Sequence, residues 1–282
     1  MNATTALLDH TEVRPARPAR TITRTRRNDV AAVPAAINSE WIKLRSLRSN
    51  RAIFAFAILF GVVMSWILAK LVKTDPYGHK AFTVAGSFMV STWLTTVLAV
   101  IVGILAFTSE VQHGTISQSI AAQPARFVSV CGKAVVVAGF GMAMGAVSMG
   151  AGFGGAVVSG LRMGNTSHIA ATVGWSLLLT TLAGVLGLGL GMIIRHSSAA
   201  VSTALVWTFV VENLVRNMAP ARVSRFLPFS AANGLLTIRS AGDTAATVAA
   251  KLSRPQDALL FVGYTAVALV VGTMALYRRD PE

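Results

Sequence analysis

The stretch AIFAFAILFGVVMSWILA, residues 52–69, holds eighteen consecutive residues without a charge, most of them apolar. A helix needs about 20 such residues to cross roughly 30 Å of hydrocarbon, because lipid offers no partner for an unpaired backbone amide. The stretch therefore predicts a membrane-spanning helix over residues 52–72. A cleaved secretory signal peptide has a short basic head, whereas this apolar run starts only after fifty-one residues, so we expect it to be retained.

Five further apolar stretches follow along the chain. They cover residues 82–107, 134–161, 169–194, 197–215 and 258–277. The stretch 197–215 is the weakest of them, because Glu212 interrupts it near one end. The fold class that we expect is an all-α integral membrane protein with six transmembrane helices.

The composition agrees with this fold class. Apolar residues make up 54% of the chain and charged residues 13%, which is the wrong balance for a surface that faces water. The net charge of +14 would suggest a nucleic-acid partner in a soluble protein. Here, however, ten of the 25 basic residues precede position 52, and the stretches 82–107, 134–161 and 169–194 carry no charge. We therefore expect a lipid-embedded chain with a basic edge and no nucleic-acid partner.

Residues 1–34 carry six arginines and three prolines with almost no large apolar side chains. Such a composition cannot bury a core, so it predicts a disordered basic tail on the cytoplasmic side. The role of this tail is left open.

The segment AINSEWIKLRSLRSNR, residues 36–51, joins this tail to the first span. Helical spacing places Ile37, Trp41, Leu44 and Leu47 near one face and the basic side chains elsewhere, with a helix start at Ser39. This pattern predicts an interfacial helix on the cytoplasmic leaflet, where basic side chains meet anionic lipid and Trp41 suits the headgroup depth. The helix either only anchors the first span or also docks a partner.

Orientation follows from the basic residues beside the membrane ends. A cytoplasmic N-terminus places fifteen of them inside and ten outside. The positive-inside rule expects basic residues in the cytoplasmic connections, whereas six of the outside charges lie in the connection 216–257. The first helix, however, usually determines the orientation. We expect both termini in the cytoplasm of a bacterium, with the spans in its cell membrane. Proline at 220, 228 and 255 excludes one continuous helix across the connection, which is either a folded cap or a re-entrant hairpin.

Glycines are frequent within the predicted spans. Residues 150–155, GAGFGG, satisfy the spacing of a dinucleotide-binding loop, but they lie inside a charge-free span and not between a strand and a helix. Glycines four residues apart instead let helix backbones approach closely in lipid. The pairs that predict such helix packing are Gly141 with Gly145, Gly150 with Gly154, and Gly187 with Gly191.

No motif of catalysis or metal binding is visible. Gly132 and Lys133 lack the upstream glycine and the following hydroxyl of a phosphate-binding loop, so the chain is not expected to be its own ATPase. The single cysteine, Cys131, excludes an intrachain disulfide, and the five histidines lack the spacing of metal ligands. We therefore expect no catalytic residue, no metal and no cofactor in this chain.

Glu212 is the one acidic residue inside a predicted span. At the centre of the bilayer an acidic side chain costs about 2.5 to 3.5 kcal/mol on insertion scales. Glu212 lies near the predicted outer end, and Arg216 follows four residues later, where the two side chains share a helix face. They form either an interfacial ion pair or a polar group that lines a transport path.

The connection between the second and third spans has a distinctive pattern in FTSEVQHGTISQSIAAQPARFVSVCGKA, residues 107–134. Glu110 follows the long apolar helix, Gly114 and Thr115 come next, and Pro124 precedes a basic-flanked span. Together with SEWIKLRSLRS (39–49) and FLPFSAANGL (226–235), this resembles the permeases of type-2 exporters among ATP-binding-cassette (ABC) transporters, particularly the Ala- and Gly-rich actinobacterial kind. The resemblance covers most of residues 35–282 and leaves out the basic tail.

The resemblance implies a six-helix permease domain over residues 35–282 that pairs with a second permease subunit, identical or different. Two separate ATPase subunits on the cytoplasmic side would bind ATP and Mg²⁺ and drive this dimer. The positions that would contact the ATPase are Trp41, Lys43, Arg45, Glu110, Gly114 and Thr115. Gly114 would permit a backbone bend in a docking loop. The alternative is an ordinary solvated loop in which Glu110 ends a helix.

The leading hypothesis is therefore the membrane subunit of an ATP-driven exporter. The few charges within the spans favour a hydrophobic or amphipathic substrate that moves outward. The alternative is a non-transporting multi-pass membrane protein, such as an anchor, a sensor or a partner in a resistance system. An ion-coupled transporter ranks last, because it would normally show several buried charges where only Glu212 is present.

Overall fold

Helices make up the regular structure in the computed structural model, which describes residues 29–46, 48–73, 84–115, 126–160, 169–236 and 251–279. In chain order they are α1 (Asp29–Ser46), α2 (Arg48–Lys73), α3 (Val84–Gln112), α5 (Arg126–Val158), α6 (Ile169–Ile194), α7 (Ser197–Val206), the π-helix η2 (Trp207–Val211), α8 (Glu212–Met218), α9 (Ala221–Ser224), α10 (Pro228–Leu236) and α12 (Arg254–Arg279). Residues 1–28 of the predicted tail and residues 237–250 of the predicted outer connection lie outside the described residues.

Within the described ranges, six helices are long and apolar enough to cross a membrane. Five of them are α2, α3, α5, α6 and α12, and the other is formed by α7, η2 and α8 in succession. The predicted all-α membrane protein with six spans is thus confirmed. The helix α1 is an additional element that precedes the first span.

Several helices extend beyond the apolar stretches that predicted them. The helix α3 continues to Gln112, past the predicted end at residue 107, and α5 begins at Arg126 instead of residue 134. A helix need not end where its apolar run ends, because its backbone stays hydrogen-bonded while charged side chains reach water or one another. These extensions place Glu110 and Lys133 inside helices.

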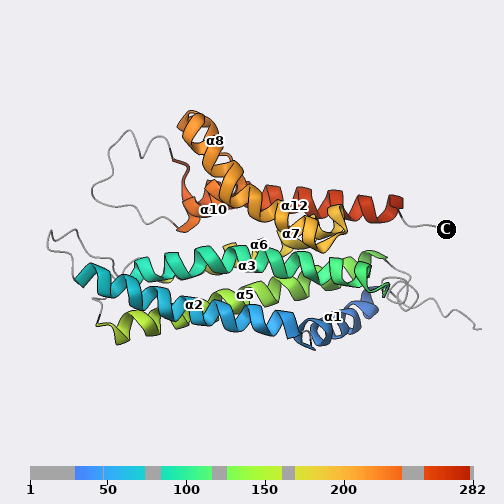
Figure 1. Ribbon diagram of the computed structural model, residues 1–282. Helices are drawn as coiled ribbons and strands as arrows, with labels where there is room; N and C mark the ends of the chain where they lie inside the picture. Colours follow the sequence, from blue (N-terminus) through green and yellow to red (C-terminus); the bar gives the residue numbers. More distant parts are fainter. Residues whose placement is uncertain are drawn as a thin grey trace, which may run out of the picture.

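The helices α3 and α6 form the centre of the bundle (Figure 1). On one side, a shared hydrophobic core joins them to α7, α10 and α12. On the other side, α2 and α5 pack against α3 around a second core, to which Leu44 of α1 contributes. We call the two ends of the bundle the α1 end, where α12 also finishes, and the α10 end, where α8 lies (Figure 1).

The contact between α3 and α6 depends on glycine. A Cβ atom at Gly103 would collide with the backbone of Gly184, and a Cβ atom at Gly187 would collide with the backbone of Val100. The two helices run parallel, because later residues of α3 meet later residues of α6, as Gly191 does beside Ile104. In lipid, helices associate through such close packing, since there is no hydrophobic drive to bring them together.

The predicted glycine pairs differ in their surroundings. Gly141 and Gly145 lie against Thr180 of α6, and Gly187 and Gly191 lie against α3. Gly150 and Gly154 have no atom of another described helix within 4 Å of a Cβ position. Four-residue spacing places two glycines on one helix face, but it does not determine which face meets a neighbour.

The helix α1 starts earlier than the sequence suggested. It begins at Asp29, so the predicted start at Ser39 is wrong, and its first residues overlap the end of the predicted tail. The Ser39 hydroxyl lies in mid-helix and donates to the Ala36 carbonyl at 2.8 Å. At the other end, the Asn50 side chain of α2 donates to the Leu44 carbonyl at 3.1 Å, which satisfies one of the last carbonyls of α1.

The helix α1 packs one face against the bundle, a contact that its predicted interfacial position does not include. Ala36, Glu40 and Leu44 are buried, whereas Trp41 is exposed. Of the predicted interfacial face, Leu44 packs into the bundle and Trp41 faces outward, while Leu47 lies outside the described residues. The observed rotation brings the carboxylate of Glu40 into the bundle because, as described below, it finds a buried partner there.

We expect Gly187→Ala to destabilise the protein, because the added methyl group would force α3 and α6 apart. Gly150→Ala is the matched control: its methyl group meets no neighbour, and the change removes the helix penalty of glycine, about 0.5–1 kcal/mol. Thermal unfolding of the detergent-purified protein measures both effects. A Gly187→Ala protein as stable as the control would contradict the close packing of α3 on α6.

Candidate functional site

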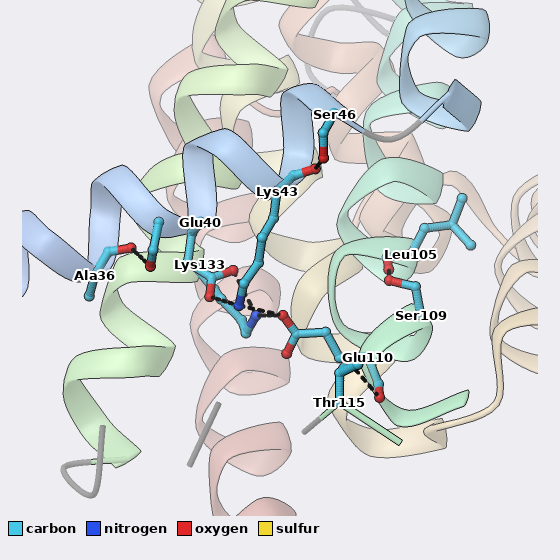
Figure 2. A network of polar contacts seen from close by, with 10 residues as sticks. Ala36, Glu40, Lys43, Ser46, Leu105, Ser109, Glu110, Thr115 and Lys133 are labelled. Carbon is cyan, nitrogen blue, oxygen red and sulfur yellow. Dashed lines mark hydrogen bonds and ion pairs between the residues drawn. The ribbon is translucent and has the colours of Figure 1, made fainter. Parts of the chain in front are cut away.

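Four charged side chains from α1, α3 and α5 meet at the α1 end of the bundle (Figure 2). The Lys133 Nζ atom of α5 lies 2.7 Å from Glu40 Oε2 on α1 and 2.6 Å from Glu110 Oε1 on α3. The Lys43 Nζ atom, also on α1, lies 2.9 Å from Glu40 Oε1 and 3.1 Å from Glu110 Oε1. We call these four residues the charge cluster.

The charge cluster is largely buried and carries no net charge. The side chains of Lys133, Glu40 and Glu110 are 5%, 7% and 10% exposed. Two ammonium groups face two carboxylates, so each buried charge has an opposite charge beside it. Removal of one partner from such a group typically costs about 3–5 kcal/mol, because it leaves a charge buried without compensation.

Local packing brings these residues together. Gly132 lies against α1, where a Cβ atom would come within 3.2 Å of Ala36 Cβ, so α1 and α5 are in direct contact just before Lys133. Glu40 follows Ala36 by one helical turn and shares its buried face. Glu110 lies in the last turn of α3, where the helix dipole disfavours a negative charge. The two lysines offset that effect.

Lys43 is the outermost member of the cluster, with 45% of its side chain exposed. Burial by itself lowers the pKa of Lys43, but the hydrogen bond to Glu40 and the negative charges of Glu110 and Glu40 outweigh it and raise the pKa above its ordinary value. Lys43 therefore remains charged at physiological pH. Because solvent screens it, its contribution to stability is smaller than that of Lys133.

The end of α3 has a defined geometry. Gly114 adopts a left-handed φ of 67°, the Gly114 amide donates to the Val111 carbonyl at 3.3 Å, and the Thr115 amide donates to the Glu110 carbonyl at 3.0 Å. This pair of bonds is the Schellman motif that commonly ends helices at a glycine. Gly114 thus fixes the point at which α3 ends.

The structure separates the six predicted ATPase contacts into two groups. Glu110 and Lys43 belong to the charge cluster and bind other elements of the same chain. The remaining four are Trp41 and Arg45 on the outward face of α1, and Gly114 and Thr115 in the turn after α3. Among the described residues, no hydrogen-bond donor reaches Glu110 Oε2.

Sequence reasoning missed Glu40 and Lys133 as members of a site. The charge-free stretch from residue 134 places Lys133 just outside the predicted span, as a basic residue that flanks it. The available signal was the apolar run that precedes it, FVSVC at residues 127–131, which continues the helix outward and places Lys133 within it. Glu40 carried a weaker signal, its spacing of three residues from Lys43.

A second polar group lies at the α10 end. Arg216 Nη2 lies 3.9 Å from Glu212 Oε2, so the predicted ion pair is present, but Glu212 makes shorter contacts with other residues. Asp257, in the first turn of α12, is also buried, and it was missed because the predicted span began one residue later. Within the described ranges, no group of three or more His, Cys, Asp or Glu residues could hold a metal ion.

We expect Lys133→Met to lower the stability of the protein by about 3–5 kcal/mol, because the carboxylates of Glu40 and Glu110 would remain buried beside Lys43 alone. Lys43→Met is the control, with an expected loss of about 1 kcal/mol or less, since that side chain is half exposed. Adding Glu40→Gln and Glu110→Gln to Lys133→Met should restore much of the loss. Thermal unfolding in detergent measures the series, and a fully stable Lys133→Met protein would contradict the role of the cluster.

Comparison with known proteins gives one family. Comparison with curated proteins finds no match. A family model described as "ABC-2 family transporter protein" matches residues 36–212, well over half of the 282-residue chain. The matched region includes the whole charge cluster and runs from α1 to Glu212. Proteins of this family form the membrane component of ABC transporters and work with an ABC ATPase subunit. The chain therefore belongs to the ABC-2 transporter family, as a multi-pass permease subunit.

Proposed function

We propose that this permease exports a hydrophobic or amphipathic substrate, and that its ATPase partner docks at the α1 end of the bundle. The observation that carries the proposal is the charge cluster, because it joins the helix before the first span to the end of α3 and the start of α5. The helix α1 and the end of α12 would then lie on the cytoplasmic side, and we propose both termini there. A second permease subunit, identical or different, would complete the transporter.

The charge cluster suits a coupling role because it fixes three elements at one point. Helices that are firmly attached to one another shift as rigid bodies when one of them is displaced. A push on α1 would reach α5 through Lys133 and α3 through Glu110. Since α3 lies against α6 along its glycine contacts, the same displacement would pass into the centre of the bundle.

The docking surface that we propose consists of Trp41 and Arg45 on α1 together with the turn at Gly114. Trp41 is 41% exposed, and tryptophan and arginine are the residue types that most often carry the binding energy of interfaces. Glu110 is not part of this surface, because its side chain is occupied within the charge cluster.

The interior of the bundle supports an apolar or amphipathic substrate. Charged side chains of the described spans that are also buried lie near the ends, as Lys133 and Glu110 do at one end and Glu212 and Asp257 at the other. Between them the core is built from apolar side chains and from hydroxyls such as Thr95 and Ser148. A small inorganic ion would need more charged or polar ligands along its path.

We expect Trp41→Ala combined with Arg45→Glu to reduce the amount of ATPase that co-purifies with the tagged permease by roughly fivefold or more, the effect of losing an interface anchor. The stability of the permease should hardly change, since both side chains are exposed. Arg222→Glu is the matched control: it reverses an exposed arginine at the α10 end. Purification from native membranes in mild detergent measures all three.

Two results would contradict the proposal in different ways. If no nucleotide-binding subunit co-purifies with the unaltered permease, the coupling to an ATPase at this end is wrong. If the ATPase binds the double variant as well as it binds the Arg222→Glu control, the docking surface is wrong while the transporter class stands. Variants of Glu110 cannot make this distinction, because they would also disturb the charge cluster.

A further inference from the structure

The fifth span is interrupted just before Glu212. Its buried positions are Ala200, Ala204, Thr208 and Glu212, four residues apart. In an α-helix each step of four residues rotates the face by about 40°, so such a series would turn away from the bundle. The π-helix η2 reverses this rotation, because its turn holds one more residue than an α-helical turn. Its last hydrogen bond joins the Glu212 amide to the Trp207 carbonyl. The interruption therefore keeps Glu212 directed inward.

The carboxylate of Glu212 is held mainly by α10. Glu212 Oε1 accepts a hydrogen bond from the Phe229 amide at 2.8 Å and another from Trp207 Nε1 at 3.1 Å, while Arg216 lies at 3.9 Å. Phe229 is the second residue of α10, so its amide has no partner within the helix. Pro228, the first residue, has no amide to satisfy. A carboxylate at this position also complements the helix dipole.

The helix α10 is packed into the end of the bundle. Five of its nine residues are buried, and they contact α3, α6 and α12. Gly234 lies directly against the Asp257 carboxylate of α12, where a Cβ atom would collide. The Tyr264 hydroxyl of α12 donates to the Phe226 carbonyl at 2.7 Å, just before α10 begins. The helix is thus fixed to α12 along its side and to the fifth span at its start.

The helix α8 has little other support. It packs mainly on its chain neighbours η2 and α9, and it leans away from the rest of the bundle (Figure 1). Leu214 and Met218 on α8 are 57% and 78% exposed. The bond from Glu212 to Phe229 therefore connects the half of the fifth span that stands apart from the bundle to a helix embedded in it.

We propose that Glu212 is a positioning residue that couples the fifth span to α10, so that α8 and α10 move as one unit at the α10 end during transport. The role of this movement in transport rests on the proposed function. The link itself is a property of the single chain and can be measured without an ATPase. It assigns Glu212 to the attachment of α10, and Arg216 to a minor role.

The test uses a cysteine reporter on α10. Ala231→Cys in a Cys131→Ala background places a thiol at a position that is 0% exposed. The rate at which a water-soluble maleimide labels this thiol reports how often α10 detaches from the bundle. We expect Glu212→Gln to raise the labelling rate roughly tenfold or more, since it weakens a hydrogen bond to a charged group. Arg216→Gln, the matched control, should change the rate by no more than about twofold, as surface substitutions do.

Global unfolding is separated from local release by the native thiol. Cys131 is partly buried in α5, far along the chain from α10. In protein that retains Cys131 and Ala231, maleimide labelling of Cys131 therefore reports on the α1 end. Its labelling rate should be the same with Glu212 and with Glu212→Gln. A rise at both thiols would count against a local link, and so would an unchanged rate at Ala231→Cys. Equal acceleration by Arg216→Gln would assign the link to the ion pair and overturn the proposal.

A second arm uses the complex with the ATPase, if it co-purifies as proposed. A non-hydrolysable ATP analogue should change the labelling rate of Ala231→Cys when Glu212 is present and leave it unchanged in Glu212→Gln. A side chain that only stabilises the fold would not alter this nucleotide response, so an undiminished response in the variant would overturn the coupling. Failure of the ATPase to co-purify would overturn the proposed function and leave the single-chain measurement standing.

Discussion

The bundle depends on how closely α3 and α6 approach each other. In a lipid solvent, apolar side chains gain nothing by leaving the hydrocarbon for one another, so helices must associate through close packing and polar contacts. Gly103 and Gly187 supply that packing, because each lies against the backbone of the opposite helix. The remaining helices attach to this pair, with α2 and α5 on one side and α10 and α12 on the other. Each end of the bundle is then completed by buried charge.

The two ends use charge differently. At the α1 end, Lys133 lies between carboxylates from two other helices, so it joins elements that are far apart in the chain. At the α10 end, Glu212 satisfies a backbone amide of α10, so one side chain takes the place of a missing turn of helix. Both arrangements give a buried charge a partner, because a buried charge without a partner is costly in lipid. Both connect a peripheral helix to the packed centre.

The sequence was sufficient for the spans and insufficient for the contacts between them. Apolar length predicts a transmembrane helix because backbone hydrogen bonding in lipid leaves no other choice. It does not predict which face of a helix meets a neighbour: Gly141 and Gly145 lie against α6, whereas Gly150 and Gly154 have no described atom of this chain within 4 Å of a Cβ position. Lys133 and Glu40 were missed for the same reason. Their pairing depends on the rotation of α1 against the bundle, which the spacing of its apolar residues does not determine, since Leu44 is buried and Trp41 is exposed.

The burial of Lys133 has a consequence for how the protein responds to salt. At physiological ionic strength the Debye length is about 8 Å, so exposed charges that are farther apart than this hardly interact. Buried ion pairs are screened much less. Lys133 of α5, which holds α1 through Glu40, is 5% exposed, whereas Arg45 lies on the outward face of α1. Concentrated salt would therefore weaken an attachment that depends on Arg45 and leave α1 in its place. On the proposal that the ATPase docks on α1, a salt-washed membrane would keep the permease with α1 still packed in place and ready to bind its ATPase again on dilution.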